Sequence, residues 1–94
     1  MADILDEGMI EQLLEKIPEW EADDAYISRT FEFETYMEGI EFVNRVAELA
    51  EEEDHHPEMD VRFGWVEVSL TSDEEGGLTE KDFQVAQRID ALIA

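Results

Sequence analysis

The sequence has no cysteine and very few basic residues. The absence of cysteine excludes disulfide bonds, thiolate nucleophiles and zinc–thiolate sites. Lysine and arginine together number 6, against 27 aspartates and glutamates. Because proteins bind the phosphate backbone through a basic patch, this balance disfavours direct binding of nucleic acid.

Long hydrophobic runs are also missing. No stretch approaches the roughly 18 consecutive apolar residues of a membrane-spanning helix, so we expect no membrane association. The first residues, MADILDEGM, have neither the basic flank nor the apolar centre of a signal peptide. We therefore expect a cytoplasmic protein.

The excess of carboxylates gives a formal net charge of −21. A folded monomer of this mass exposes a surface of about 5,600 Å². Divided among the units of net charge, this area places neighbouring charges about 16 Å apart. The screening length is about 8 Å in ordinary salt and about 3 Å at 1 M. Such a surface is typical of a halophilic protein, or of an acidic binder of basic partners. The dispersal of the carboxylates between apolar positions along the whole chain favours the first interpretation.

A chain of this length is expected to form one domain, residues 1–94, with a single core that is marginal without oligomerisation. Helical spacing of apolar residues predicts a first helix over residues 6–17, with Asp6 as its N-cap and Pro18 ending it. The alternation that follows predicts a two-stranded hairpin turning near Asp23-Asp24, with apolar positions at Ile27, Phe31 and Phe33.

Residues 36–53 return to the helical period and predict a second helix. Its apolar arc consists of Ile40, Val43, Ala47 and Ala50, widened by Phe42, Val46 and Leu49. This arc is broader than packing on one sheet requires, which indicates that part of it meets another subunit.

Residues 61–71 show a strand pattern whose phase changes in the middle. Val66, Val68 and Leu70 share one face, whereas Val61, Phe63 and Trp65 have the opposite phase. A bulge or sharp bend near Gly64 would reconcile the two patterns. Residues 74–77 are predicted to form a loop.

A last helix is expected after Leu78, with Thr79 as its cap and Asp82 at the third helical position. The predicted buried stripe of this helix is Phe83, Ala86, Ile89 and Ile93. The predicted order is thus α-β-β-α-β-α, with a further strand possible before the last helix. Sequential pairing of the strands favours an α+β fold, in which the helices cover one face of an antiparallel sheet. The other face would need covering or charging.

Both histidines of the chain, His55 and His56, stand side by side before Pro57. They could be a helix stop that complements the negative end of the helix dipole. They could also bind a metal with Asp54 or Glu58, but adjacent residues point in different directions and no third histidine or cysteine exists, so no metal is expected. The third interpretation is general acid–base chemistry, because imidazoles can hold one proton and one vacancy near neutral pH.

The wider pattern of the chain resembles the pterin-4a-carbinolamine dehydratases. The resemblance is carried by Glu51-x-x-x-His55-His56-Pro57, the aromatic Phe63 and the segment Gly77-Leu78-Thr79-x-x-Asp82. It extends to ISRTFEF, FVNRVAELAEE and LLEKIPEW, and so covers nearly all of the chain.

The resemblance implies a four-stranded antiparallel sheet in the order α-β-β-α-β-β-α, with helices packed on one face, and assembly into homodimers or homotetramers. The implied reaction is dehydration of 4a-hydroxytetrahydropterin to the quinonoid dihydropterin, without metal or organic cofactor. His55 is expected to be the base at N5 of the pterin and His56 the acid toward the leaving hydroxyl. Further residues implied for the site are Asp82 as a supporting carboxylate, Pro57 in the pocket wall, Glu51, and the loop of Ser72, Asp73, Glu74 and Glu75 that contacts the substrate.

The match departs from the family pattern at Asp73, where the family usually carries a third histidine. At pH 7 an ordinary imidazole is protonated in about one molecule in four, and an ordinary aspartic acid in about one in a thousand. If this position donates a proton, the replacement loses a factor of about 10² to 10⁴. The alternative is that Asp73 orients a protonated His56. The departure also leaves open a second function, in which the chain is a weak or inactive family member that binds a protein partner as a dimerisation or assembly factor.

Overall fold

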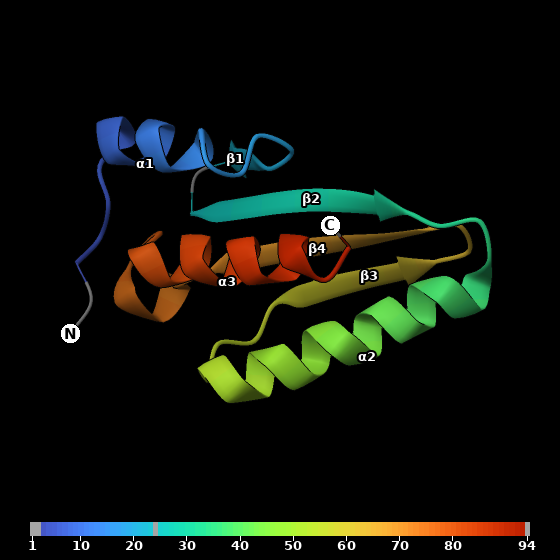
Figure 1. Ribbon diagram of the computed structural model, residues 1–94. Helices are drawn as coiled ribbons and strands as arrows, with labels where there is room; N and C mark the ends of the chain where they lie inside the picture. The colour runs from blue at the N-terminus through green and yellow to red at the C-terminus, as the bar shows by residue number, and fades with distance from the viewer. Residues whose placement is uncertain (1–2, 24, 94) are drawn as a thin grey trace.

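The computed structural model describes residues 3–23 and 25–93. In this part of the chain the helices and strands follow the order α-β-β-α-β-β-α (Figure 1). Their bounds are α1 Glu7–Leu14, β1 Glu21–Asp23, β2 Tyr26–Glu32, α2 Tyr36–Glu53, β3 Glu58–Arg62, β4 Trp65–Thr71 and α3 Glu80–Ala91, with a 3-10 turn, η1, over Asp73–Glu75. The predicted α+β fold is confirmed.

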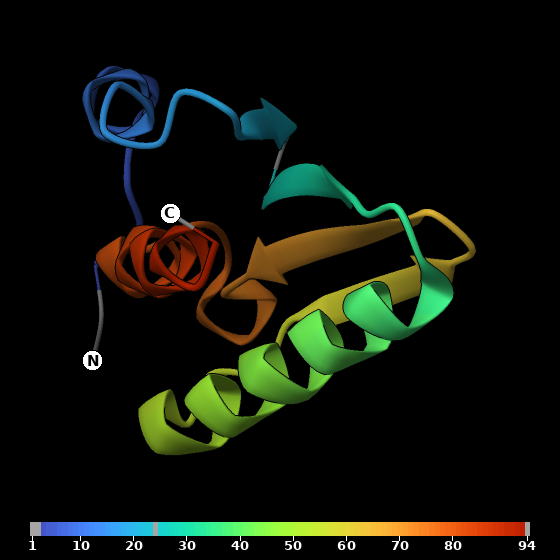
Figure 2. The same cartoon turned by 45° about the vertical axis from the view of Figure 1, so that its right-hand side comes forward.

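The strands form one antiparallel sheet in the spatial order β1-β2-β4-β3. Figure 2 shows the helices together on one side of this sheet. The core lies between the two layers, where the buried side chains of β2 and β4 meet those of α2 and α3. Strands β2 and β4 are therefore central, and β3 forms one edge.

Strand β4 alternates between the two faces of the sheet, as its sequence predicts. Val66, Val68 and Leu70 are completely buried beneath the helices. The residues between them, Glu67 and Ser69, are only half-buried on the opposite face. This face is polar and charged, which suits contact with water.

The change of phase near Gly64 marks a reversal of the chain. Arg62 pairs with Trp65, so Phe63 and Gly64 form a two-residue turn between β3 and β4. Gly64 has a φ of 89°, a conformation that glycine adopts without strain. A bulge is therefore not needed, because the strand pattern of residues 61–71 belongs to two strands.

The hairpin of β1 and β2 forms with Asp23 opposite Tyr26. Asp24, the second residue of the predicted turn, lies outside the described residues. Helix α1 begins after the predicted cap: the side chain of Asp6 accepts a hydrogen bond of 2.9 Å from the backbone N–H of Met9. The predicted end of this helix is too late, since α1 stops at Leu14 and irregular turns follow up to Pro18.

Helix α2 has the predicted bounds, but its buried stripe is different from the expected one. The side chains that face the sheet are Phe42, Val46, Leu49 and Ala50, alongside Gly39. Ile40 and Val43 are half-buried and Ala47 is exposed. Phe42, Val46 and Leu49, which were expected only to widen the apolar arc, therefore form its centre. Their large side chains fill the space over the sheet.

Helix α3 begins after Thr79, as predicted, and buries Asp82, Phe83, Val85, Ala86 and Ile89. Ile93 was expected in this stripe but is 44 % exposed, because the helix ends at Ala91. Near the end of α3, Asp90 accepts hydrogen bonds from Trp20 Nε1 at 2.9 Å and Arg29 Nη1 at 2.8 Å. These contacts hold α3 against the first part of the sheet.

Candidate active site

The histidine segment begins where α2 ends. Asp54 adopts the left-handed conformation, with φ 52° and ψ 43°, which aspartate tolerates better than most residues. The backbone N–H of His55 then donates to the carbonyl oxygen of Ala50 at 3.1 Å and closes the last turn of the helix. Residues 55–57 run on to β3, so the two neighbouring imidazoles leave the backbone in different directions.

The His55 ring points inward to a buried carboxylate. Its Nε2 lies 2.6 Å from Oδ1 of Asp82, and the side chain of Asp82 is completely buried. The other oxygen of Asp82, Oδ2, accepts from Ser72 Oγ at 2.8 Å and from the backbone N–H of Thr79 at 3.0 Å. Charge-assisted hydrogen bonds of this kind are short and strongly directional. Three contacts therefore fix the carboxylate, and the carboxylate fixes His55.

Helix geometry explains why a carboxylate occupies this place. Asp82 is the third residue of α3, where an acidic side chain commonly returns to the N-cap backbone, here that of Thr79. Because Ser72 gives its hydrogen to Asp82, Thr79 Oγ1 is the donor in the 3.0 Å contact between the two hydroxyls. The start of α3 and the end of β4 are thus joined by one buried polar network below His55.

The His56 ring points outward and pairs with a different carboxylate. Its Nε2 lies 2.5 Å from Oε2 of Glu51, one turn back on α2. The exposed fractions of the two side chains are 56 % and 77 %, against 16 % for His55. The two imidazoles are therefore an inner and an outer one, each held by its own carboxylate.

Both imidazoles border the same pocket, which has a volume of about 570 Å³. This is within the range of about 300 to 1,000 Å³ that is typical of small-molecule sites. The pocket lies between the end of α2, the end of β4 and the start of α3, and its lining residues are Asp54, His55, His56, Thr71, Ser72, Asp73, Glu74, Glu75, Thr79 and Lys81. It is large enough for a flat bicyclic ring system.

Most of the residues that the sequence analysis named for the site lie along this pocket: His55, His56, Ser72, Asp73, Glu74 and Glu75. Three others do not line it. Asp82 is buried beneath His55, and Glu51 stands behind His56. Pro57, which was expected to shape the pocket wall, is not among the lining residues.

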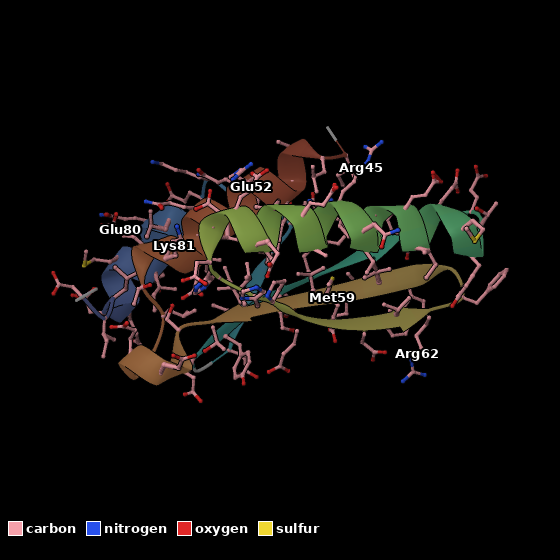
Figure 3. The ribbon with its side chains drawn as sticks, turned by 90° about the horizontal axis from the view of Figure 1, so that it is seen from below. Arg45, Glu52, Met59, Arg62, Glu80 and Lys81 are labelled. Carbon is pink, nitrogen blue, oxygen red and sulfur yellow. The ribbon has the colours of Figure 1, made fainter. Side chains whose placement is uncertain are left out.

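The pocket also has lining residues that the sequence analysis did not assign to it: Asp54, Thr71, Thr79 and Lys81. Lys81 provides the one ammonium group along this wall. Its Nζ lies 2.5 Å from Glu53 Oε1, and Arg88 Nη1 lies 2.5 Å from the other oxygen of Glu53. Figure 3 shows Lys81 beside the end of α2. Its sequence position next to Asp82, in the first turn of a helix, was the signal that could have indicated it.

The ion pairs around Glu53 have a clear electrostatic effect. Hydrogen bonds from Lys81 and, second, from Arg88 hold the pKa of Glu53 below its usual range. Glu53 is the last residue of α2, and both cations lie on α3. The charged carboxylate thus connects the two helices that flank the pocket.

Asp73 is exposed on the 3-10 turn at the rim of the pocket. The negative charge of Glu58 raises the pKa of the Tyr26 phenol, and burial and the charge of Asp73 raise it further. The phenol therefore remains protonated at neutral pH, next to two carboxylates. Asp73 lies in a strongly negative part of the pocket rim, together with Glu74 and Glu75.

No cluster of three or more His, Cys, Asp or Glu side chains with metal-binding geometry is found within residues 3–23 and 25–93. Within the same ranges, none of the helices combines the length and the apolar character needed to cross a bilayer. The residues that line the pocket carry imidazole, carboxylate and hydroxyl groups and one ammonium group.

Comparisons with known proteins show which family and which solved structures this chain is similar to. A family model described as "Pterin 4 alpha carbinolamine dehydratase" matches residues 3–92. A protein of Thermomicrobium roseum, whose name assigns it provisionally to the pterin-4-alpha-carbinolamine dehydratases, is 44 % identical over 88 residues, covering 94 % of this chain and 95 % of its own.

Two solved structures have the same fold. The crystal structure of a transcriptional coactivator/pterin dehydratase from Brucella melitensis superposes with a TM-score of 0.92 at 29 % identity, over 98 % of this chain and 100 % of that one. A pterin dehydratase-like protein identified as a RuBisCO assembly factor in the alpha-carboxysome has a TM-score of 0.64 at 26 % identity, over 78 % of this chain and 84 % of that one.

Proposed function

Because the chain belongs to the pterin 4 alpha carbinolamine dehydratase family, we propose that it dehydrates a 4a-hydroxytetrahydropterin to the quinonoid dihydropterin. The observation that carries this proposal is the pair of imidazoles on one pocket, with His55 held by the buried carboxylate of Asp82. An elimination of water needs one group that accepts a proton and one that donates a proton. Two differently held imidazoles are suited to these two roles.

In the proposed step, the C4a–O bond breaks while His56 gives a proton to the departing hydroxyl, so that water leaves. The proton on N5 passes to His55, and the electron pair of that N–H bond forms the double bond between N5 and C4a. His55 suits the role of base because its Nε2 faces Asp82, which leaves Nδ1 as the nitrogen that can accept a proton. His56 suits the role of acid because its ring borders the pocket and is held through Nε2 by Glu51, which leaves Nδ1 as the nitrogen that can face the departing hydroxyl.

Asp73 bears on the rate of this reaction. The family usually has a histidine at this position, and a carboxylate is a much rarer proton donor at neutral pH. We infer that the chain works with two histidines, and that its turnover is slow in comparison with relatives that have three. The exposed position of Asp73 on the rim supports a role in the electrostatics of the pocket.

The working environment is part of the proposal. A surface of 6,122 Å² that carries a net charge of −21 has about 290 Å² for each unit of charge. Concentrated salt screens such repulsion within about 3 Å at 1 M, compared with about 8 Å at ordinary salt. We therefore infer a salt-rich cytoplasm as the place of action.

Assembly into a homodimer or homotetramer also belongs to the proposal. Strand β3 ends the sheet order β1-β2-β4-β3, so one of its sides has no neighbouring strand within the sheet. Ile40 and Val43 on α2 are only half-buried. Sedimentation equilibrium at 0.1 M and 2 M salt measures the assembly, and a monomer at both would refute this part.

The test of the activity uses purified protein in molar salt and a synthetic 4a-hydroxytetrahydropterin. The wild type is expected to accelerate dehydration above the buffer rate, and His55→Ala combined with His56→Ala should remove the acceleration. A wild type that only equals buffer would end the dehydratase proposal. Circular dichroism of the double variant checks that its fold is intact.

A second candidate function is binding of a protein partner, which the assembly-factor relative and a second hollow of the surface favour. This groove has a volume of about 420 Å³ and lies between the end of β2, the first half of α2 and the end of α3. Phe33, Phe42, Leu92 and Ile93 form its apolar part, and its charged residues are Glu32, Glu34, Glu38, Glu41 and Arg45. Four carboxylates against one arginine select a partner segment with an apolar side chain flanked by Lys or Arg.

A pair of charge reversals on α2 tests this second function. Glu41→Lys changes the groove, whereas Glu48→Lys makes the same change on the same helix outside the groove. A partner recovered in stoichiometric amount from the native lysate in molar salt should be lost with the first variant and kept with the second. Equal recovery with both variants would mean that the groove is not the binding surface.

A further inference from the structure

Three of the residues that line the pocket carry a hydroxyl group, and two of these hydroxyls make hydrogen bonds inside the protein. Ser72 Oγ donates to Asp82, and Thr79 Oγ1 contacts Ser72 Oγ at 3.0 Å. The third, Thr71 Oγ1, is shielded from solvent and has no hydrogen-bond partner within residues 3–23 and 25–93. A buried hydroxyl without a partner is unfavourable, and each such group in a native protein calls for an explanation.

The position of Thr71 makes this hydroxyl more unusual. Thr71 is the last residue of β4, a place where the β-branched shape of threonine fits well. Valine has the same shape, equal or better strand propensity and no hydroxyl to satisfy. The protein fold alone therefore gives no reason for the oxygen atom of Thr71. Thr71 lines the same pocket as His55 and His56, and this is the observation that places it near the proposed chemistry.

We infer that the Thr71 hydroxyl is a hydrogen-bonding contact for the substrate, and that its ligand is an amide-like edge of a flat heterocycle. This inference rests on the proposed dehydratase function. A pterin has such an edge, with a ring N–H, a carbonyl oxygen and an amino group. A hydroxyl can donate to the carbonyl oxygen or accept from the N–H. Because Thr71 Oγ1 is shielded in the structure, the proposed contact requires a rotation about χ1 that brings the oxygen to the pocket in place of the methyl group of similar size.

The energetic argument separates Thr71 from its two neighbours. A pterin that bonds to Ser72 or Thr79 would have to compete with bonds that already exist in the protein. A pterin that bonds to Thr71 supplies a first partner and removes an unfavourable state of the free protein. The sequence analysis expected the loop that begins at Ser72 to contact the substrate. We extend this contact to the side chain of Thr71, whereas the side chain of Ser72 binds Asp82.

The test is Thr71→Val, an isosteric change that removes only the hydroxyl. We expect this variant to unfold at the same or a higher temperature, because no internal bond is lost. We also expect about a tenfold weaker affinity for 7,8-dihydrobiopterin in calorimetry, with KM raised and kcat retained. Thr71→Ser, which keeps the hydroxyl, should restore the affinity.

Two further variants are controls for this test. Thr30→Val makes the same change at an exposed position of β2 outside the pocket and should leave the affinity unchanged. Ser72→Ala breaks a buried bond to Asp82 and should lower the unfolding temperature, unlike Thr71→Val. Unchanged affinity in Thr71→Val, or a lower unfolding temperature without loss of affinity, would overturn the inference.

The test of Thr71 can fail independently of the test of the dehydratase activity. If the wild type binds 7,8-dihydrobiopterin but does not accelerate dehydration, the dehydratase proposal fails, and the affinity of Thr71→Val still decides the role of the hydroxyl. If the wild type does not bind the pterin at all, both fail.

Discussion

Replacing Asp82 by asparagine tests the link between the buried network and the chemistry. In the wild type, Oδ2 of Asp82 accepts two hydrogen bonds, from Ser72 Oγ at 2.8 Å and from the Thr79 backbone at 3.0 Å. An asparagine has one oxygen, and both donors require it. The amide nitrogen must therefore occupy the place of Oδ1 and face Nε2 of His55, which is 2.6 Å from that place in the wild type.

This orientation reverses the hydrogen bond to His55. The amide group presents N–H to Nε2, so His55 must accept there and carry its own hydrogen on Nδ1. An imidazolium would place N–H against N–H and is disfavoured. In the proposed reaction Nδ1 must be free to accept the proton from N5, so Asp82→Asn blocks the base.

The expected magnitudes follow from the same contacts. Loss of a positioned acid or base typically lowers a rate by about 10² to 10⁴, and we expect kcat to fall by at least about 10². Hydrogen bonds to a charged acceptor contribute about 1 kcal/mol more than neutral ones, so two weakened bonds lower the free energy of unfolding by about 2 kcal/mol. Dehydration kinetics in molar salt measures the first effect and denaturant unfolding in the same buffer measures the second.

The ¹⁵N resonances of His55 report its tautomer directly, and Glu51→Gln is the matched control. Glu51→Gln makes the same change, carboxylate to amide, at the other histidine, but its side chain is 77 % exposed and its amide can rotate freely. It should leave the tautomer of His55 unchanged and shift the free energy of unfolding by no more than about 1 kcal/mol. If His55 in Asp82→Asn keeps its hydrogen on Nε2, or if kcat stays within twofold of the wild type, the reasoning is refuted.

Three further changes have defined outcomes. Asp73→His should raise kcat in the same assay if the wild-type pocket lacks a third proton donor, and an unchanged kcat would show that this position does not donate. The pKa of Glu53 is held below its usual range by Lys81 and Arg88, so its stabilising effect is complete above the ordinary pKa and is lost as the pH falls through the lowered value. Accordingly, Glu53→Gln should lose less free energy of unfolding than the wild type between about pH 5 and pH 3, and equal losses would contradict the ion-pair account. Finally, the unfolding temperature of the wild type should rise with sodium chloride from 0.1 M to 2 M, since salt screens the net charge of −21; a flat response would show that this charge does not limit stability.

The architecture was predictable because local patterns agree with the packing. The period of apolar residues gave the bounds of α2, and the capping residues Asp6 and Thr79 gave the starts of α1 and α3. The errors concern which apolar residues face the core. Ala47 and Ile93 have a suitable period, yet the sheet is covered by larger side chains and α3 ends before Ile93. The spacing of apolar residues along a helix does not reveal how much of the sheet that helix must cover.

Most residues along the candidate pocket could be named from the sequence, but their contacts could not. The sequence pattern marked His55 and His56, yet nothing in it distinguishes the inner ring from the outer ring. That difference arises because Asp54 takes a left-handed conformation and the chain then extends, so that successive side chains face opposite ways. The position of Thr71 along the pocket was not visible in the sequence either, because it depends on β4 and α3 meeting in space.

The two histidines also differ in their access to water, and this difference bears on how the pair is reset after the proposed reaction. Dehydration leaves His55 with an extra proton and His56 without one, so the pair must be reset before the next turnover. The side chain of His56 is 56 % exposed and can regain its proton from solvent, whereas His55 is 16 % exposed and bonded to buried Asp82. In this assignment His55 must release its extra proton while His56 regains one, and in the reverse assignment the buried ring must regain a proton. The buried ring thus exchanges one proton per turnover in both cases, so the assignment of His55 as the proposed base rests on its contact with Asp82, which leaves Nδ1 free to accept.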